Sequence, residues 1–285
     1  MSQKYKVEKD YHNSRFDRWF KANVKELPQS LIEKIIRKKK IKINRKKIKT
    51  SYRVQLGDLI EIYDISKFKI SDRPKKIKYK PSIKEVETYN DFIIENNINF
   101  IVINKPAGIA VQAGTKSFKN IIDVLKDSKY FENTKPFIVH RLDKETSGVL
   151  IIAKNREYAQ LFTSLFRIRK IHKTYIAFTH GKISDKIHTM EENLISFDKD
   201  KKLIQKAVSH IKIIKRSSDY TYVELNPITG RKHQLRKQLY NIGHPIVGDD
   251  KYFINRRFDK IKQKKKYLML HAYKIKFIIN NVKYN

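Results

Sequence analysis

The sequence of 285 residues contains no cysteine and no long hydrophobic run. The absence of cysteine excludes disulfides, thiolate nucleophiles and zinc sites built from cysteine. No stretch is apolar enough to cross a bilayer, and the first residues, Met1–Lys6, lack the hydrophobic core of a signal peptide. These absences favour a cytoplasmic protein that does not enter a membrane.

The motifs of two large enzyme classes are also missing. The nine histidines do not occur at a metal-binding spacing such as His-Glu-x-x-His. Ser147 does not lie in the Gly-x-Ser-x-Gly turn that presents the nucleophile of many serine hydrolases. We therefore expect neither a bound metal ion nor serine hydrolase chemistry.

Acidic residues are scarce, because 29 Asp and Glu accompany 64 Lys and Arg, which gives a formal net charge of +35. Residues 1–85 contain 26 basic and 10 acidic side chains, a net of +16, and the other 200 residues carry the remaining +19. The first part is thus the more basic per residue. Such a field attracts polyanions and favours a nucleic-acid partner, although lysine richness alone would also produce merely solvated surfaces.

Residues 1–65 predict a small module with a basic outer face. Aromatic residues at helical spacing predict a helix over residues 15–20. Ser30, followed by Glu33, forms a capping-box pattern that predicts the start of a second helix. Short strands are predicted at residues 41–43 and 59–62. The polar face of the second helix carries the candidate RNA-binding cations Lys34, Arg37 and Lys38.

Residues 66–85 hold two prolines, many lysines and little apolar periodicity, which predicts a basic linker. Residues 86–285 then form a larger predicted domain. Its apolar runs predict strands at residues 99–103, 149–153, 173–178, 220–225, 268–272 and 274–277. Helices are predicted at residues 121–125, from Asn155 to Ile168, and at residues 231–240.

Two stretches of the larger domain are candidates for chemistry. Asp143 is a single carboxylate in a polar cluster, residues 140–148, directly before a predicted buried strand, which is a common placement for functional groups. An ordinary loop, with Arg141 and Asp143 paired or facing water, explains the same pattern. In residues 231–236, cations near the start of a predicted helix oppose the helix macrodipole, which suggests that they meet an anion.

Five segments in this order resemble the RluA family of pseudouridine synthases, and residues 15–65 resemble the S4 RNA-binding domain. The segments are Asn104–Gly108, His140–Gly148, Lys173–Ala177, Thr229–Arg236 and His244–Asp249, and Leu270–Ala272 follows them. The resemblance is greatest to the large-subunit ribosomal RNA branch with an S4 domain (RluC-like). It implies an α+β fold, in which a large mixed, mostly antiparallel sheet with a central cleft forms the catalytic domain.

The resemblance also implies the reaction and its residues. A uridine in RNA is detached at N1, rotated and rejoined through C5, without a cofactor. Asp143 matches the catalytic aspartate, which acts as a nucleophile or as a base. Arg236 matches the cation that keeps this carboxylate ionised. Tyr175 matches the tyrosine that stacks on the base. Three further residues match positions that bind the base or the RNA. Arg141 replaces the flipped uridine, Leu235 packs beneath the base, and Arg231 contacts the RNA. Gln238 departs from the family, which often has histidine there.

Other functions remain open at this stage. The partner expected from the resemblance is large-subunit ribosomal RNA or a ribosome assembly intermediate, bound by a monomer. A synthase of the RluD-like type would act on other uridines of the same RNA. A non-catalytic ribosome assembly factor would need the same basic surfaces, and a nuclease could use His140 or His233 for acid–base catalysis.

Overall fold

The computed structural model describes residues 2–25, 27–64, 79–114, 117–132, 134–198, 201–253 and 267–285. The chain divides into two compact units, Met1–Ile77 and Lys78–Asn285. Most of the predicted linker, up to residue 78, lies outside the described residues. Beyond it, Ser82 caps helix α3, Ile83–Asn90, by accepting a hydrogen bond from the backbone N–H of Glu85. The division at residues 65 and 86 stays a prediction.

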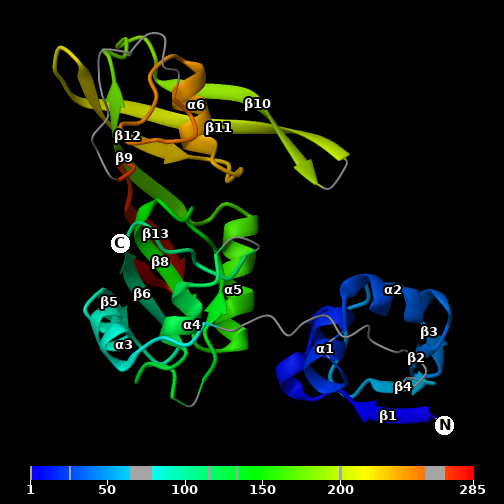
Figure 1. Cartoon of the computed structure of the whole chain (residues 1–285). Coiled ribbons are helices and arrows are strands. Elements are labelled where there is room, and N and C mark those ends of the chain that lie inside the picture. Colours follow the sequence, from blue (N-terminus) through cyan, green and yellow to red (C-terminus); the bar gives the residue numbers. More distant parts are fainter. Residues whose placement is uncertain are drawn as a thin grey trace. The chain divides into compact units, whose positions relative to one another are not determined.

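The N-terminal unit packs two helices against a four-stranded antiparallel sheet with the order β1-β4-β2-β3 (Figure 1). Its elements are β1 (Ser2–Lys6), a 3-10 turn (Lys9–Tyr11), α1 (Phe16–Asn23), α2 (Gln29–Arg37), β2 (Ile41–Ile43), β3 (Lys46–Lys47) and β4 (Leu59–Tyr63). Strand β1 has no counterpart among the predicted elements, because its residues are mostly polar and exposed.

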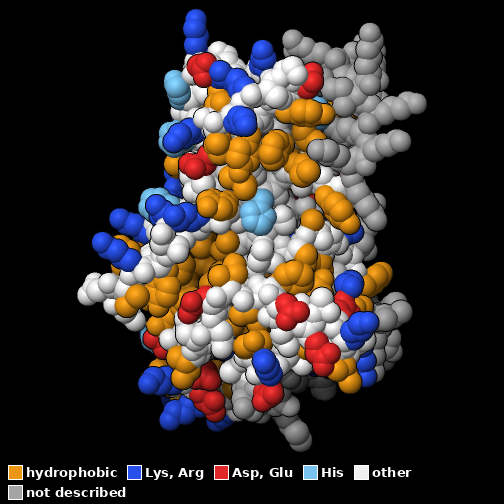
Figure 2. Space-filling model, turned by 90° about the vertical axis from the view of Figure 1, so that its left-hand side faces the viewer, with side chains coloured by type: hydrophobic (Ala, Val, Ile, Leu, Met, Phe, Trp, Pro, Cys, Tyr) orange, Lys and Arg blue, Asp and Glu red, His pale blue; other side chains and the backbone are white. Residues whose placement is uncertain are grey.

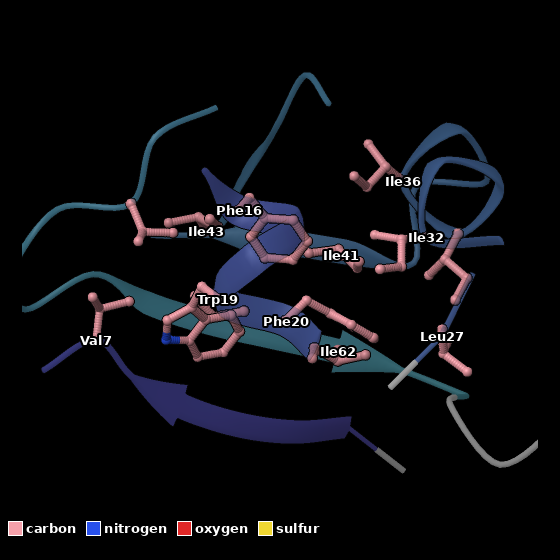
Figure 3. Close-up of a cluster of buried hydrophobic side chains, with 13 residues drawn as sticks. Val7, Phe16, Trp19, Phe20, Leu27, Ile32, Ile36, Ile41, Ile43 and Ile62 are labelled. Atoms are coloured by element: carbon pink, nitrogen blue, oxygen red, sulfur yellow. The ribbon is translucent and has the colours of Figure 1, made fainter. Parts of the chain in front are cut away.

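The core of this unit is built from the helical apolar faces. Phe16, Trp19 and Phe20 of α1 are fully buried and belong to one hydrophobic cluster with Ile32 and Ile36 of α2 (Figure 3). These contacts confirm the two predicted helices, since the periodic apolar residues face one interior. The charged face of α2 is left exposed to solvent, which places Lys34, Arg37 and Lys38 on the surface.

The predicted capping box is wrong. Helix α2 begins at Gln29, and the residue that precedes it, Pro28, has no side-chain cap. The Pro28 carbonyl accepts hydrogen bonds from the backbone of Leu31 and Ile32, so the first turn closes earlier than predicted. Proline fixes a φ of −56° that is compatible with a helix start, and Ser30 therefore lies within the helix.

The C-terminal unit is built on a ten-stranded sheet. Eight of its strands have the order β10-β11-β12-β9-β13-β8-β6-β5, and the other two, β7 and β14, pair with β8 and β13. Neighbouring strands are antiparallel except β8 and β13. The strands are β5 (Ile93–Asn96), β6 (Phe100–Lys105), β7 (Phe137–Ile138), β8 (Ser147–Ala153), β9 (His172–His180), β10 (Thr189–Asp198), β11 (Lys201–Arg216), β12 (Tyr220–Pro227), β13 (Leu270–Ile279) and β14 (Val282–Tyr284).

In the described part of this unit, four helices flank the sheet. Helices α3, α4 (Ile121–Leu125) and α5 (Arg156–Arg167) accompany the β13–β5 part, and α6 (Gln234–Asn241) accompanies β10 to β12 (Figure 1). Asn155 caps α5 as predicted, because its side chain accepts a hydrogen bond from the backbone N–H of Tyr158. Ile168, the last residue of the predicted helix, follows α5 and is 57% exposed.

Gly148 permits the parallel contact at the middle of the sheet. It pairs with Ala272, while its neighbour Ser147 pairs with His271. Its φ of +112° lies outside the range that side chains favour, and an added Cβ would collide with the carbonyl oxygen of Ala272. The polar cluster is therefore attached to the most central strands of the unit.

Two further expectations for this unit need correction, and one hairpin was not predicted. The two predicted final strands form one strand, β13, with a register shift between Ala272 and Lys274. Helix α6 begins at Gln234, so Arg231 and Lys232 precede the helix and do not occupy its first turn. The β10–β11 hairpin was not predicted, and its strands are ten and sixteen residues long.

Candidate active site

A cavity of about 720 Å³ opens among three segments of the C-terminal unit. These are the polar loop before β8, the end of α5 with the start of β9, and the turn between β12 and α6. Of the residues that the structure describes, seven Lys or Arg and one carboxylate, Asp143, line it. The basic residues are Arg141, Arg167, Arg169, Lys173, Arg231, Lys232 and Arg236. This ratio far exceeds the 64 to 29 of the whole chain, so the cavity is specialised for an anion.

The outer surface is more mixed than the cavity. On the face shown in Figure 2, hydrophobic side chains form patches between separate Lys and Arg side chains. Exposed apolar residues of the C-terminal unit include Phe178, Met269 and Tyr273. The dense positive charge of the cavity is therefore a local feature and not simply the average surface of a lysine-rich protein.

A buried lysine is hydrogen-bonded to the loop that carries Asp143. The side chain of Asp143 is 26% exposed, and its carbonyl accepts a hydrogen bond from the backbone of Thr146. Lys105, which is fully buried at the end of β6, donates from Nζ to the carbonyls of Lys144, Ile109 and Pro106 at 3.1, 3.0 and 2.8 Å. The loop carrying Asp143 is thus tied to the central sheet.

The charge of Lys105 fits this role. Burial lowers the pKa of Lys105 to about 8, while the nearby carboxylates of Glu145 and Asp143 oppose the shift. At neutral pH the amine is therefore mostly protonated, and its three N–H donors match the three carbonyl acceptors. Lys105 belongs to the Asn104–Gly108 segment, but its support of the loop was not predicted, since lysine is rarely buried.

The basic group nearest to Asp143 among the described residues is His233. Its Nε2 lies 3.7 Å from Oδ1 of Asp143, and its Nδ1 lies 2.9 Å from the hydroxyl of Tyr252. Burial lowers the pKa of His233; the charge of Asp143 opposes this shift, and Arg236, Lys251 and Lys232 add to it. The imidazole is therefore mainly neutral at neutral pH.

Arg236 was expected to pair with Asp143, and its direct partner is different. Its side chain is 5% exposed, and Nε and Nη2 donate to the two oxygens of Asp249 at 2.7 and 2.6 Å. Burial alone would lower the pKa of Arg236, but Asp249, and then Asp143 and Asp250, raise it. Arg236 and Asp143 line the same cavity, so the arginine contributes charge through space rather than through a direct ion pair.

Tyr175 and Leu235 form an apolar part of the cavity wall. Tyr175 of β9 packs against the hydrophobic clusters on both sides of it, and Leu235 of α6 is buried. Burial raises the pKa of Tyr175 well above its ordinary value, and the charge of Asp143 raises it further. The phenol therefore stays protonated at neutral pH.

Two other predicted residues lie at the same cavity. Arg141 is exposed, and Arg231 donates from Nε to the carbonyl of Lys206 in β11 at 3.1 Å. The structure thus brings six of the predicted residues together: Asp143, Tyr175, Arg236, Arg141, Leu235 and Arg231. The other three belong to the N-terminal unit: Lys34, Arg37 and Lys38.

His140 is unsuited to acid–base catalysis. Burial, followed by the charge of Lys173, lowers the pKa of His140 to about 3. Its Nε2 accepts a hydrogen bond of 2.9 Å from the backbone N–H of Ile151, and its ring packs against Phe166. The side chain is therefore a neutral support for β8, which removes one of the two histidines on which a nuclease mechanism was based.

Glutamines join α6 to the long hairpin. Gln238 is fully buried, donates to the carbonyls of Met190 and Ala207, and accepts a hydrogen bond from the hydroxyl of Ser209. Gln234 accepts from the Thr229 hydroxyl and from the backbone of Arg231. The glutamine at position 238 therefore anchors the helix.

Within the described ranges, no three His, Asp or Glu side chains are grouped so that they could hold a metal ion. Over the same part of the chain, no helix has the length and apolar character needed to cross a membrane.

Comparison with known sequences identifies the family. The family model described as RNA pseudouridylate synthase matches residues 99–241, and the S4 domain matches residues 25–60. The chain belongs to the RNA pseudouridylate synthase family. The matched part includes Asp143, Tyr175 and Arg236 and ends before Asp249.

Curated relatives support this membership over most of the chain. Ribosomal large subunit pseudouridine synthase C of Buchnera aphidicola subsp. Baizongia pistaciae is 34% identical over 95% of this chain and 88% of its own length. The protein with the same name from Rickettsia conorii is 36% identical over 91% of this chain and 88% of its own length.

A solved structure has the same catalytic fold. Human RNA Pseudouridylate Synthase Domain Containing 4 is 26% identical and superposes with a TM-score of 0.56 over 67% of this chain and 86% of that chain. The α+β architecture with a large, mostly antiparallel sheet is thereby confirmed.

Proposed function

We propose that this protein converts specific uridines of large-subunit ribosomal RNA to pseudouridine, with Asp143 as the catalytic carboxylate. The observation that carries the proposal is one carboxylate among seven basic side chains, counted over the described lining of a cavity of about 720 Å³. Binding alone gains nothing from a carboxylate that faces an anionic RNA, whereas this chemistry requires one. Both relatives named above act on the large ribosomal subunit according to their names.

The reaction proceeds on a nucleotide that has left the helix. Arg141 is exposed at the cavity and occupies the space that the extruded uridine leaves. Asp143 then acts on the ribose or the base, the bond from C1′ to N1 breaks, and the detached uracil rotates. A bond from C1′ to C5 forms, and the proton on C5 moves to N1 by way of a base. The product is an isomer of the substrate at the same oxidation level, so the reaction needs no redox cofactor and no group donor.

The surrounding residues bind and hold the uracil. The protonated phenol of Tyr175 stacks on the ring, and Leu235 packs beneath it. Arg236 adds positive charge to the cavity that also holds Asp143, and Arg231 meets the phosphates.

The N-terminal unit supplies a second RNA-binding surface. Lys34, Arg37 and Lys38 are exposed on α2, and we assign them to contacts with RNA phosphates. We divide the chain into an RNA-binding domain at residues 1–65, a linker at 66–85 and a catalytic domain at 86–285. The protein works as a cytoplasmic monomer on ribosomal RNA or an assembly intermediate.

The test uses the purified protein and a transcript of its own organism's large-subunit RNA. We expect new pseudouridines at specific positions, detected by chemical mapping, and none with Asp143→Asn, although the variant still binds the RNA. An RNA that remains unmodified by the wild-type protein, or pseudouridines formed by Asp143→Asn, would refute the catalytic role. The mapped positions also separate an RluC-like from an RluD-like enzyme, and RNA that is bound but unmodified indicates an assembly factor.

A further inference from the structure

A chain of three side chains ends at Asp143. The hydroxyl of Tyr252 lies 2.9 Å from Nδ1 of His233, and Nε2 of His233 lies 3.7 Å from Oδ1 of Asp143. The three residues come from three separate loops, since they precede β8, precede α6 and follow Asp249. The roles proposed above for the synthase reaction do not include His233 or Tyr252.

The charges around His233 decide which ring nitrogen carries the proton. A neutral imidazole has one N–H, and a carboxylate can only accept a hydrogen bond. The favourable tautomer therefore carries its hydrogen on Nε2, toward Asp143, and accepts at Nδ1 from the hydroxyl of Tyr252. The opposite tautomer would direct a lone pair toward the negative carboxylate. The neighbouring cations Arg236, Lys251 and Lys232 disfavour the doubly protonated ring.

The backbone holds His233 in an uncommon conformation. Its φ is 54° and its ψ is 31°, in the left-handed region that few non-glycine residues occupy. The flanking chain is fixed, because the backbone of Gln234 donates to Arg231 and that of Lys237 donates to His233. Strained residues persist where the surroundings determine them, and they concentrate at functional sites.

Tyr252 is held as firmly as His233. Its backbone N–H donates to Oδ1 of Asp249 at 2.9 Å, and its ring lies 5.2 Å from the guanidinium carbon of Arg236. The buried ion pair between Arg236 and Asp249 thus also fixes the phenol that contacts His233. The hydroxyl has a rigid position from which to select a tautomer.

We propose that His233 is a positioning residue for Asp143, as a neutral imidazole whose Nε2–H holds one carboxylate oxygen and whose tautomer is set by Tyr252. This inference rests on the proposed function and extends it. The second oxygen of Asp143 is left for the nucleotide. The separation of 3.7 Å exceeds a hydrogen bond, so the proposal requires the loop of Asp143 to move closer to His233 when RNA binds.

The test is a double-mutant cycle on the full chain, with the single-turnover rate of pseudouridine formation as the readout. We expect His233→Ala to lower the rate between about tenfold and about a hundredfold, since a hydrogen bond to a charged group is lost. Tyr252→Phe should lower it severalfold in the wild-type background and not at all in the His233→Ala background, because the hydroxyl acts only through the imidazole. RNA affinity and the thermal midpoint should stay unchanged in each variant.

Two amide variants keep the test decisive if alanine disturbs the fold. His233→Asn suits the left-handed backbone but is too short to reach Asp143, so we expect it to be as slow as His233→Ala. His233→Gln carries an N–H at a similar reach and should recover part of the rate. The control is His210→Ala, which removes an exposed histidine of β11 and should leave the rate unchanged.

Three results would overturn the inference. One is a His233→Ala rate within about twofold of the wild type. Another is an equal effect of Tyr252→Phe in both backgrounds, which indicates independent roles. The third is a rate loss matched by lost RNA affinity or stability, which indicates a purely structural residue. A wild-type protein that forms no pseudouridine would reject the proposed function and this inference together.

Discussion

Arg236 and Asp249 form a two-point ion pair, with Nε and Nη2 of the arginine 2.7 and 2.6 Å from the carboxylate oxygens. Both side chains are almost fully buried, and the backbone N–H groups of Lys251 and Tyr252 also donate to Asp249. Asp249 therefore controls the position of the guanidinium that lines the cavity beside Asp143.

Asp249→Ala should destabilise the protein by about 3–5 kcal/mol, because it leaves the charge of Arg236 buried without its partner. Urea unfolding measures this change in the free energy of unfolding. The matched control is Asp250→Ala: its carboxylate is 3.5 Å from Arg236 but 86% exposed, so a change within about 0.5 kcal/mol is expected.

Arg236→Ala should reduce turnover far more than RNA binding; equal losses would contradict its assigned role.

Lys105 should give the protein a specific stability change at alkaline pH. Its folded pKa of about 8 is below the ordinary 10.5, so between these values the unfolded chain binds more protons than the folded chain. The contribution of Lys105 to the free energy of unfolding therefore rises by about 1 kcal/mol per pH unit above pH 8 and is constant below pH 8. We expect the unfolding free energy of the wild type minus that of Lys105→Met to rise between pH 8 and pH 10. A flat difference would show that the amine is not perturbed.

Gly148→Ala should be far more damaging than Gly108→Ala, although both glycines have positive φ. At Gly148 the added Cβ collides with Ala272, whereas at Gly108 nothing lies within 4 Å of it. We expect a loss of about 3 kcal/mol or more at Gly148 and about 1–2 kcal/mol at Gly108, measured by urea unfolding. Similar losses at both positions would mean that the close approach of β8 and β13 is not rigid.

The exposed cations of α2 should determine part of the salt dependence of RNA binding. Changing Lys34, Arg37 and Lys38 together to glutamine should lower the slope of log K against log salt by about 2–3. The control changes three exposed lysines of the same unit, Lys4, Lys6 and Lys9, and so has the same net charge. If both triple variants lower the slope equally, general charge rather than a defined α2 surface is responsible.

Local patterns in the sequence were sufficient for much of the fold. The apolar spacing in α1 and α2, the β-branched run of β8 and the Asn155 cap are all set by neighbouring residues, and the structure confirms them. The β10–β11 hairpin was missed because a lysine-rich ribbon with one exposed face lacks a clear apolar alternation.

The cavity was predicted in composition but not in its contacts. The order of the motifs identified the residues that line the cavity. The partner of Arg236 could not be identified in this way, because it depends on how the chain after α6 folds back to bring Asp249 to Arg236. The contacts that Lys105 and His233 make around Asp143 were not predicted, for a related reason. A lysine is expected at the surface, and the left-handed backbone of His233 cannot be inferred from residue type alone.

The placement of β13 also has a consequence for biosynthesis. This strand, Leu270–Ile279, inserts between β9 and β8, which precede it by roughly a hundred residues or more. Until β13 emerges from the ribosome, the sheet remains as two separate halves with unpaired edges at β9 and β8. The strand that follows the loop of Asp143, β8, then lacks its partner β13. Activity should therefore arise only after β13 has been synthesised and has paired with β9 and β8.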